Sequence, residues 1–274
     1  MFEVDNLIKV ALDEDIGMKD LTTVSIISPG KEMTGEVIAN EDLVLSGIDI
    51  FYRVFTFLNS KVKFKKFFED GDHVNKRNII ANISCDAVDL LRGERVALNF
   101  LQRLSGITSL THKYVEKVKN YYAKVVDTRK TTPGWRSLEK YAVKMGGGMN
   151  HRSGLFDGVL IKDNHIRVCG GIGHAVKKAK CNIPHTFKIE IEVKNLDEVR
   201  EAIDSGVDVI MLDNMDIKEM EKAVQLVNKR TIIEASGGIN LDNIGDVAKT
   251  GVDIISVGAL THSARAYDIS MDIV

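Results

Sequence analysis

The sequence has little of the long apolar runs that direct a protein into or across a membrane. No stretch of its 274 residues approaches the roughly 18 consecutive apolar residues of a membrane-spanning helix. Residues 1–15 mix charged and apolar side chains, without the basic segment and following apolar run of a signal peptide. We therefore expect a cytoplasmic protein that has no membrane partner.

Cysteine is scarce as well. The chain has three cysteines, Cys85, Cys169 and Cys181, and no two of them form a C-x-x-C pair. Such usage is typical of a reducing compartment, and a metal site built on these residues would lack the usual ligand spacing. We expect all three to be free structural thiols.

Neither sign of charge is in clear excess. The 37 Lys and Arg residues and the 39 Asp and Glu residues leave a formal net charge of -2, so no overall field favours nucleic acid or an anionic membrane. Apolar residues make up 44% of the chain, which is enough for a substantial core. If a polyanion binds, the positive charge that attracts it must be concentrated locally.

Residues 1–110 alternate short strands with two helices. Alternating patterns predict strands over these ranges: 34–40, 43–46, 61–67 and 78–84. In the first helix, Ile48, Phe51, Phe55 and Leu58 fall at helical spacing and predict one buried stripe.

The second helix is expected over residues 91–104, with Gly106 where a helix terminator belongs. On one of its faces Arg95, Asn99 and Arg103 recur every four residues. This polar ridge is either solvated surface or a surface offered to another subunit.

From residue 122 onward the pattern changes to strand, loop and helix, repeated. Val- and Ile-rich strands are predicted over these ranges: 123–127, 158–162, 187–193, 207–212, 231–235 and 253–257. Amphipathic helices are predicted between them, among others over 137–145, 196–205 and 218–228. Nearly all-apolar strands alternating with helices predict a parallel α/β domain. Periodicity alone does not decide between an incomplete barrel and an open, doubly wound sheet.

Polar residues or glycine accompany the end of every one of these six strands. In parallel α/β folds the carboxyl ends of the strands converge on the active site. We therefore expect one shared pocket formed by these groups: 127–132, 162–165, Glu190 with Glu192, Asp213 with Asn214, 236–238, and Gly258.

Basic side chains gather around the first two strand ends. They are Arg129, Lys130, His151, Arg152 and Lys162. Two or more planar guanidinium groups suit a dianion. Surface ion pairs are the alternative, but these positions are strand ends flanked by threonine, glycine and asparagine. The stretch 127–165 therefore predicts an enzyme site for a small, highly anionic substrate.

The acidic residues follow the next two strands. Glu190 and Glu192 are two residues apart, so both point to one face of their strand. An inward carboxylate is costly unless it is paired or bound to a metal. Together with Asp213 they predict a site for Mg²⁺ carried by a phosphorylated substrate. For Glu190 the alternative is a buried ion pair with nearby lysines.

The glycines after the last two strands predict a phosphate pocket. Ser236, Gly237, Gly238 and Gly258 occupy positions at which barrels commonly bind phosphate through backbone N–H groups. The glycine run 146–148 ends a helix and lets the chain return to the pocket.

Several of these segments carry a resemblance to a known family. They span 94–107, 128–134 (Thr-Arg-Lys-Thr-Thr-Pro-Gly), 146–152 (Gly-Gly-Gly-Met-Asn-His-Arg), 161–165, 212–214 and 234–239. In this order they resemble the quinolinate phosphoribosyltransferases, also called carboxylating nicotinate-nucleotide pyrophosphorylases, over nearly the whole chain. The resemblance implies an N-terminal α/β sandwich over 1–108 and an incomplete six- or seven-stranded α/β barrel over 109–266, with 267–274 able to return to the first domain.

The resemblance also implies an activity. The enzyme would transfer phosphoribose from phosphoribosyl pyrophosphate to the ring nitrogen of quinolinate. The products would be nicotinate mononucleotide, pyrophosphate and CO₂, in NAD biosynthesis, with Mg²⁺ required.

Roles for individual residues come from the same resemblance. Arg129, His151, Arg152 and Lys162 would hold the two carboxylates, and Arg95 would reach in from the neighbouring subunit of a homodimer. The catalytic and metal-side residues would be Lys130, Glu192 and Asp213, with Mg²⁺ bound directly or through water. The phosphate pocket would be formed by Ser236, Gly237, Gly238 and Gly258.

Two other functions are weighed against this one. The first is a sibling phosphoribosyltransferase on the same scaffold, such as the ModD-like proteins of molybdate gene clusters, which have a similar Thr-Arg-Lys-Thr loop. The second is a non-catalytic sensor of pyridine carboxylates, against which the presence of Glu192 and Asp213 counts. A hexamer or a dimer of dimers is also left open.

Overall fold

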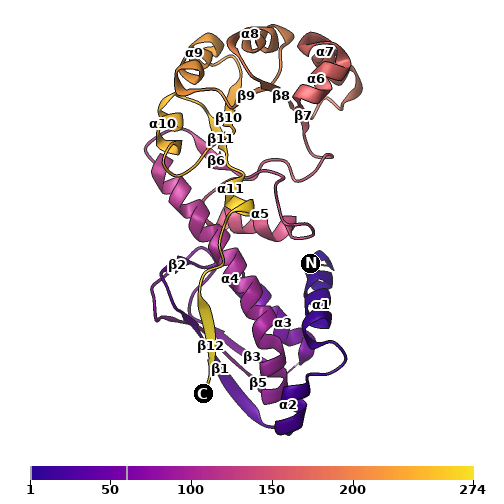
Figure 1. Ribbon diagram of the computed structural model, residues 1–274, viewed down its shortest axis with the longest axis vertical. Coiled ribbons are helices and arrows are strands. Elements are labelled where there is room, and N and C mark those ends of the chain that lie inside the picture. The colour runs from indigo at the N-terminus through magenta and orange to yellow at the C-terminus, as the bar shows by residue number, and fades with distance from the viewer. Residues whose placement is uncertain (1, 60) are drawn as a thin grey trace. The chain divides into compact units, whose positions relative to one another are not determined.

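The computed structural model describes residues 2–59 and 61–274 (Figure 1). The chain forms two compact units. The first contains Met1–His112, Pro133–Gly146 and Ala264–Val274, and the second contains Lys113–Thr132 and Gly147–Ser263. Each unit therefore combines segments that are far apart in the sequence.

The first unit is built on a four-stranded antiparallel sheet. Its strand order is β12 (Ile269–Ile273), β1 (Glu32–Ala39), β5 (Ile79–Asp86) and β3 (Lys63–Lys66). A separate short pair joins β2 (Leu43–Val44) to β4 (His73–Val74). The four strands predicted in this part are confirmed, and the burial of β1 alternates along its second half because one face of the sheet covers the core.

Helix α3 (Ile48–Leu58) supplies large side chains to that core. Ile48, Phe51 and Phe55 are fully buried, and the ring centroids of the two phenylalanines are 5.3 Å apart. The predicted stripe is confirmed except at Leu58, which is partly exposed. Helices α1 (Phe2–Ile16) and α2 (Leu21–Ile26) precede the sheet and were not predicted.

The predicted end of the second helix at Gly106 is wrong. Helix α4 spans Ala87–Val118 and continues through this glycine. A Cβ atom at Gly106 would lie 1.9 Å from the carbonyl oxygen of Arg265. The glycine therefore permits close approach of another backbone segment and does not terminate the helix.

The polar ridge on α4 divides into two environments. Arg103 donates to the Glu139 Oε1 atom at 2.8 Å and to the carbonyl oxygen of Ala264 at 2.5 Å. Its side chain is only 25% exposed, whereas the side chain of Arg95 is 59% exposed. Arg103 thus joins three segments of the first unit, while Arg95 faces solvent.

The second unit contains six parallel strands, as predicted. Their order in the sheet is β6 (Lys124–Val126), β11 (Ile254–Ser256), β10 (Ile232–Ser236), β9 (Val209–Asp213), β8 (Ile189–Val193) and β7 (Val159–Ile161). The helices of this unit are α6 (Asp163–Cys169), α7 (Ile172–Asn182), α8 (Leu196–Ser205), α9 (Ile217–Val227), α10 (Ile244–Lys249) and α11 (Ala259–His262). Figure 1 shows α7, α8 and α9 along the outer side of the strands.

The strand order decides between a barrel and a doubly wound sheet. From β7 to β11 each strand lies next to its successor in the sequence, without the reversal of order that defines a doubly wound fold. β6 and β7 occupy opposite edges and do not pair with each other in the described part of the chain. The unit is therefore an incomplete, six-stranded α/β barrel.

A short return of the chain lies beside the open edge at β6. The Met149 N–H donates to the carbonyl oxygen of Val125 at 2.9 Å, and the Asp127 N–H donates to the carbonyl oxygen of Met149 at 3.2 Å. This return follows α5 (Arg136–Met145) and the glycines 146–148, as predicted. It brings the residues after Met149 to the end of β6.

The described residues include no helix that is both long and apolar enough to cross a membrane. The three cysteines are free, as predicted. Burial raises the pKa of the Cys85 thiol to about 11, so this cysteine has the properties of a structural thiol. Cys169 is only partly buried and Cys181 is exposed.

Candidate active site

A pocket of about 750 Å³ lies at the carboxyl ends of the barrel strands. Every strand of the barrel contributes to its wall, through Thr128, Lys162, Glu192, Asp213, Ser236 and Ser256. The six strand ends therefore form one pocket, as the sequence predicts. Its volume is ample for two small substrates side by side.

The predicted site residues fall into two groups. Those that line this pocket are Arg129, Lys130, His151, Arg152, Lys162, Glu192, Asp213, Ser236, Gly237, Gly238 and Gly258. Arg95 belongs to the first unit, where it lies on α4 with its guanidinium 3.8 Å from the Glu94 carboxylate. Glu190 is 8% exposed and lies in the barrel interior without forming the pocket wall.

A buried aspartate holds the basic loop in place. Asp127 is completely buried at the end of β6. Its carboxylate accepts hydrogen bonds from the Asn150 Nδ2 atom at 2.6 Å and from the His151 backbone N–H at 2.9 Å. These bonds to a charged acceptor fix the segment that carries His151 and Arg152.

Two guanidinium groups meet in the pocket wall. The Arg152 Nη1 atom donates to the carbonyl oxygen of Gly158 at 2.9 Å, which orients its side chain. Burial and the neighbouring positive charge of Arg129 lower the pKa of Arg152. An arginine stays protonated in spite of such a shift, so the two like charges favour an anion between them.

Lysine and acid side chains pair across the ends of β7 and β8. The Lys162 Nζ atom forms an ion pair with Glu192, and the Lys194 Nζ atom lies 3.0 Å from the Asp163 Oδ2 atom. The Lys162 and Glu192 side chains are 47% and 11% exposed. The side chains of Lys162 and Glu192 both face the pocket. A bound anion can therefore replace Glu192 as the partner of Lys162, and a bound cation can replace Lys162 as the partner of Glu192.

The end of β9 is shaped by Asn214. Its backbone has a positive φ of 56°, its N–H donates to the Ser236 carbonyl oxygen, and its Nδ2 atom lies 2.9 Å from the Asp213 Oδ1 atom. A Cβ atom at Gly237 would lie 2.3 Å from the Asn214 Oδ1 atom. Glycine is therefore required at 237, and Asn214 positions Asp213.

The pocket end of β11 brings Gly258, Lys130 and His262 together. A Cβ atom at Gly258 would lie 3.1 Å from both the Lys130 Cδ atom and the His262 Nε2 atom. The Thr261 hydroxyl donates to the Lys130 carbonyl oxygen at 2.7 Å. His262 lines the pocket but was not predicted. Its position one helical turn after a glycine at a strand end could have indicated that it faces the pocket.

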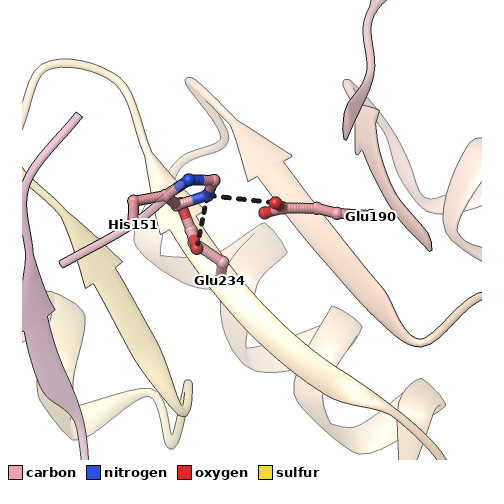
Figure 2. A group of neighbouring side chains, drawn as sticks. All are labelled: His151, Glu190 and Glu234. Carbon is pink, nitrogen blue, oxygen red and sulfur yellow. Dashed lines mark ion pairs between the residues drawn. The ribbon is translucent and has the colours of Figure 1, made fainter. Parts of the chain in front are cut away.

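A histidine and two glutamates form a cluster in the barrel interior. In Figure 2 the imidazole of His151 lies between the carboxyl groups of Glu190 and Glu234. Its Nε2 atom is 3.0 Å from the Glu190 Oε2 atom and 3.6 Å from the Glu234 Oε2 atom. One ligand atom from each residue lies within 4.8 Å of the others, which is close enough for a metal site. Among the described residues Glu190 therefore pairs with a histidine, and the ion pair with lysine that was weighed as its alternative role is not found.

Glu234 is the member of this cluster that the sequence analysis missed. It is 1% exposed, and burial together with the Glu190 charge raises its pKa to about 8, against the opposing effect of His151. It stands two residues before Ser236 on the same strand, so both side chains point to the pocket side of β10. The two-residue spacing from Ser236 is the feature of the sequence that could have indicated that Glu234 faces the pocket.

Taken together, the barrel and its pocket define an enzyme that acts on anionic, phosphorylated substrates. Two family models match the chain: the C-terminal domain of quinolinate phosphoribosyl transferase over residues 107–272 and the N-terminal domain over residues 20–105. The chain therefore belongs to the quinolinate phosphoribosyltransferase family, a family of pentosyltransferases.

Individual relatives agree with this assignment. A probable carboxylating nicotinate-nucleotide pyrophosphorylase of Bacillus subtilis is 45% identical, with 95% of this chain and 90% of the relative covered. One from Methanocaldococcus jannaschii is also 45% identical, with 98% and 96% covered. The crystal structure of NadC from Streptococcus pyogenes superimposes with a TM-score of 0.96 at 42% identity, with 100% of this chain and 97% of that chain covered.

Proposed function

We propose that the protein transfers phosphoribose from phosphoribosyl pyrophosphate to the ring nitrogen of quinolinate in the biosynthesis of NAD. Carbon dioxide is lost, and nicotinate mononucleotide and pyrophosphate are released. The observation that carries this proposal is the composition of the barrel pocket, which is basic at the ends of β6 and β7 and rich in acids and glycines at the ends of β8 to β11.

The basic side of the pocket suits quinolinate. This substrate carries two carboxylates, and Arg129 and Arg152 present two guanidinium groups within one pocket wall. Lys162 lies at the rim with its Nζ atom paired to Glu192. Binding a dianion between these cations offsets the repulsion between the guanidinium groups, which gives affinity and orientation together.

The opposite side suits the phosphorylated substrate. Gly237 and Gly238 have φ angles of 92° and 63°, a backbone conformation that glycine adopts readily, and neither has a side chain that would keep an anion from its backbone N–H group. Gly258 leaves space beside Lys130 that a side chain would fill. We assign these glycines and Ser236 to phosphate and Lys130 to the pyrophosphate group that leaves.

Glu192 and Asp213 are the proposed Mg²⁺ ligands, directly or through water. Glu192 is level with Met211 in the β8–β9 ladder, so Asp213 lies one pleat further on the adjacent strand and both face the pocket. This donor set fits Mg²⁺, which takes few protein carboxylates and completes its shell with water and phosphate oxygens. When bound, Mg²⁺ would neutralise negative charge on the pyrophosphate.

The residues of the chain then act by position and charge. Glycosyl transfer passes through an electron-poor ribose, which the carboxylates at the ends of β8 and β9 stabilise. The bond between ribose and pyrophosphate breaks as the quinolinate nitrogen bonds to the ribose. The alkylated ring is cationic, so its adjacent carboxylate leaves as CO₂, the electron pair stays on the ring carbon as an ylide, and that carbon takes up one proton. This route needs no side-chain nucleophile.

A homodimer with shared active sites completes the proposal. Arg95 has a solvent-facing guanidinium on α4, and we assign it to the quinolinate site of a neighbouring subunit. A higher assembly of such dimers, such as a hexamer, is compatible with the same sharing. We place the protein in the cytoplasm.

One incubation tests the activity. The purified protein is mixed with quinolinate, phosphoribosyl pyrophosphate and Mg²⁺, and the products are identified by mass spectrometry. We expect nicotinate mononucleotide, pyrophosphate and CO₂ in equal amounts, and none when either substrate is omitted or EDTA is added. Tight binding of quinolinate without turnover would identify a sensor, and turnover of another acceptor only would identify a sibling enzyme.

A further inference from the structure

The cluster of His151, Glu190 and Glu234 has a defined proton arrangement. The backbone N–H of Arg152 donates to the His151 Nδ1 atom at 2.8 Å. A nitrogen that accepts a hydrogen bond carries no proton, so the single proton of this imidazole is on Nε2. The Nε2–H group points to the Glu190 carboxylate at 3.0 Å. His151 is therefore a neutral imidazole with both ring nitrogens engaged by protein groups.

A neutral imidazole has no positive charge that would compensate the negative charges of two buried carboxylates. Glu190 and Glu234 are 8% and 1% exposed and lie on strands of the same sheet, on the pocket side. In such surroundings Glu234 carries a proton, because a second negative charge beside Glu190 would have no solvent around it. Glu234 is the more deeply buried of the two. A hydrogen bond between the two carboxyl groups contributes to its raised pKa.

We propose that Glu234 is a positioning residue that, as a neutral acid hydrogen-bonded to Glu190, fixes the imidazole of His151 and through its Nδ1 atom the main chain of Arg152. This inference rests on the proposed function, because it assigns the fixed Arg152 guanidinium to quinolinate. Glu234 is one of the pocket-lining residues, and the role proposed for it is to hold Glu190 and His151 in place. Its effect reaches the pocket through Glu190, His151 and Arg152, in that order.

The same three side chains have ligand atoms close enough together for a metal site. The geometry of His151 instead favours a proton on Nε2, shared in a hydrogen bond with Glu190. A metal ligand must present a lone pair, whereas Nδ1 receives the Arg152 N–H and Nε2 directs its own hydrogen to Glu190. A metal would require the other tautomer and the loss of the bond to Arg152. Metal analysis is therefore one arm of the test.

The decisive comparison is between Glu234→Gln and Glu234→Leu. Glutamine has the shape and neutrality of the protonated acid and can donate an N–H to Glu190, whereas leucine leaves that carboxylate unpaired in the interior. We expect the glutamine variant to keep both Michaelis constants within about twofold of the parent, and leucine to raise KM for quinolinate roughly tenfold to a hundredfold. KM for phosphoribosyl pyrophosphate should stay within about twofold in both variants.

Matched controls are Glu221→Gln and Glu221→Leu, on the exposed face of α9. They remove a carboxylate from the same unit and should leave both Michaelis constants unchanged. Equal loss in the glutamine and leucine variants, or equal changes in the two Michaelis constants, would overturn the positioning role. So would one equivalent of tightly bound metal in the protein without substrate that disappears in Glu234→Gln.

A measurement on the parent protein keeps the proposal testable if Glu234→Leu does not fold. Histidine-selective ¹⁵N labelling, with the His151 signal assigned through His151→Gln, reports the ring tautomer. We expect one protonated nitrogen, Nε2, at neutral pH, and a doubly protonated ring would refute the arrangement. Absence of nicotinate mononucleotide from the parent protein would instead refute the proposed function, so the two failures are distinct.

Discussion

Arg129 and Arg152 show how single side chains determine what the pocket accepts. Each is held on a loop at the end of a strand, and Asp127 and Gly158 fix the loop and the side chain of Arg152. Charge brought together in this way is not visible in a net charge of -2. Removing one cation should therefore affect quinolinate far more than overall stability.

The first prediction concerns Arg129→Ala. Arg129 is exposed here, and its charged contact would be buried when quinolinate binds. Truncating one partner of such a contact costs about 2–5 kcal/mol of transition-state stabilisation, so kcat/KM for quinolinate should fall by roughly 30-fold to several thousandfold. Initial rates at varied quinolinate measure this. Arg200→Ala, which removes an exposed arginine paired with Asp197 on α8, is the control and should leave kcat/KM unchanged. An unaltered kcat/KM in the Arg129 variant would contradict the assignment.

The second prediction concerns the pH dependence of stability. The pKa of Glu234 is raised from an ordinary 4.5 to about 8, so the folded protein holds a proton that the unfolded chain releases. The stabilisation is complete below pH 4.5 and is lost as the pH rises through about 8. Relative to Glu234→Gln, the free energy of unfolding should fall with pH by up to about 1.4 kcal/mol per unit in that window.

Urea unfolding of both proteins at several pH values between about 5 and about 8.5 checks this slope. Glu221→Gln serves as the exposed control and should follow the parent protein at every pH. A difference between the parent and Glu234→Gln that does not change with pH would mean that Glu234 is not protonated in the folded state.

At this scale the sequence predicted many of the residues that line the pocket, because strand ends can be located from apolar runs. It missed Glu234 and His262 for different physical reasons. Glu234 lies inside a strand whose neighbours are apolar, and only its spacing from Ser236 shows which way it faces. His262 lies on α11, which has four residues and is too short for a periodic pattern.

At the scale of elements, α4 shows that a glycine can lie inside a helix as well as at its end. Glycine after an amphipathic stretch is a common helix end, yet α4 passes through Gly106 for another three turns. The reason is tertiary: the Arg265 backbone occupies the space of the missing side chain. A contact with a residue so distant in the chain leaves no local pattern. By contrast, α8 was predicted at its observed bounds, and the structure shows that both of its ends are local, with Asn195 as the N-cap and Gly206 as the C-cap.

The third prediction is that Gly106→Ala destabilises the first unit. The added Cβ atom would lie 1.9 Å from the Arg265 carbonyl oxygen, so the backbone must move. Such overpacking costs about 1–3 kcal/mol, which exceeds the roughly 1 kcal/mol that alanine gains over glycine in a helix. The matched control is Gly245→Ala on α10, where a Cβ atom meets nothing within 4 Å. Thermal unfolding should show a lower Tm for the first variant and an equal or higher Tm for the second.

At the scale of the whole molecule, the proposed dimer makes each active site depend on two chains. The fourth prediction follows from mixing two inactive variants, Arg95→Ala and Lys130→Ala. A heterodimer of the two regains one intact site, so random exchange of subunits should restore about a quarter of the parent activity. Activity is measured after partial unfolding and refolding of the mixture. No recovery, together with confirmed heterodimers, would place Arg95 in the site of its own chain.

Sedimentation of the purified protein gives the stoichiometry that this experiment needs. The proposed dimer follows from the family resemblance alone, since the polar ridge on α4 fits solvent and a partner subunit equally well. The class of the second unit was only partly predictable. Alternating strands and helices predict a parallel sheet, but the barrel is recognised from the spatial order of strands, which periodicity does not contain.

The segmented composition of the first unit has a consequence for synthesis on the ribosome. Strand β12 pairs with β1 across almost the full length of the chain, and the same unit includes Pro133–Gly146. The second unit is continuous except for that insertion and ends at Ser263. All of its strands are therefore translated while β1 has only β5 beside it and its other partner, β12, has not yet been made. The first unit therefore begins before the second and is completed after it, and the edge of β1 is open to pairing with another chain until β12 has been translated.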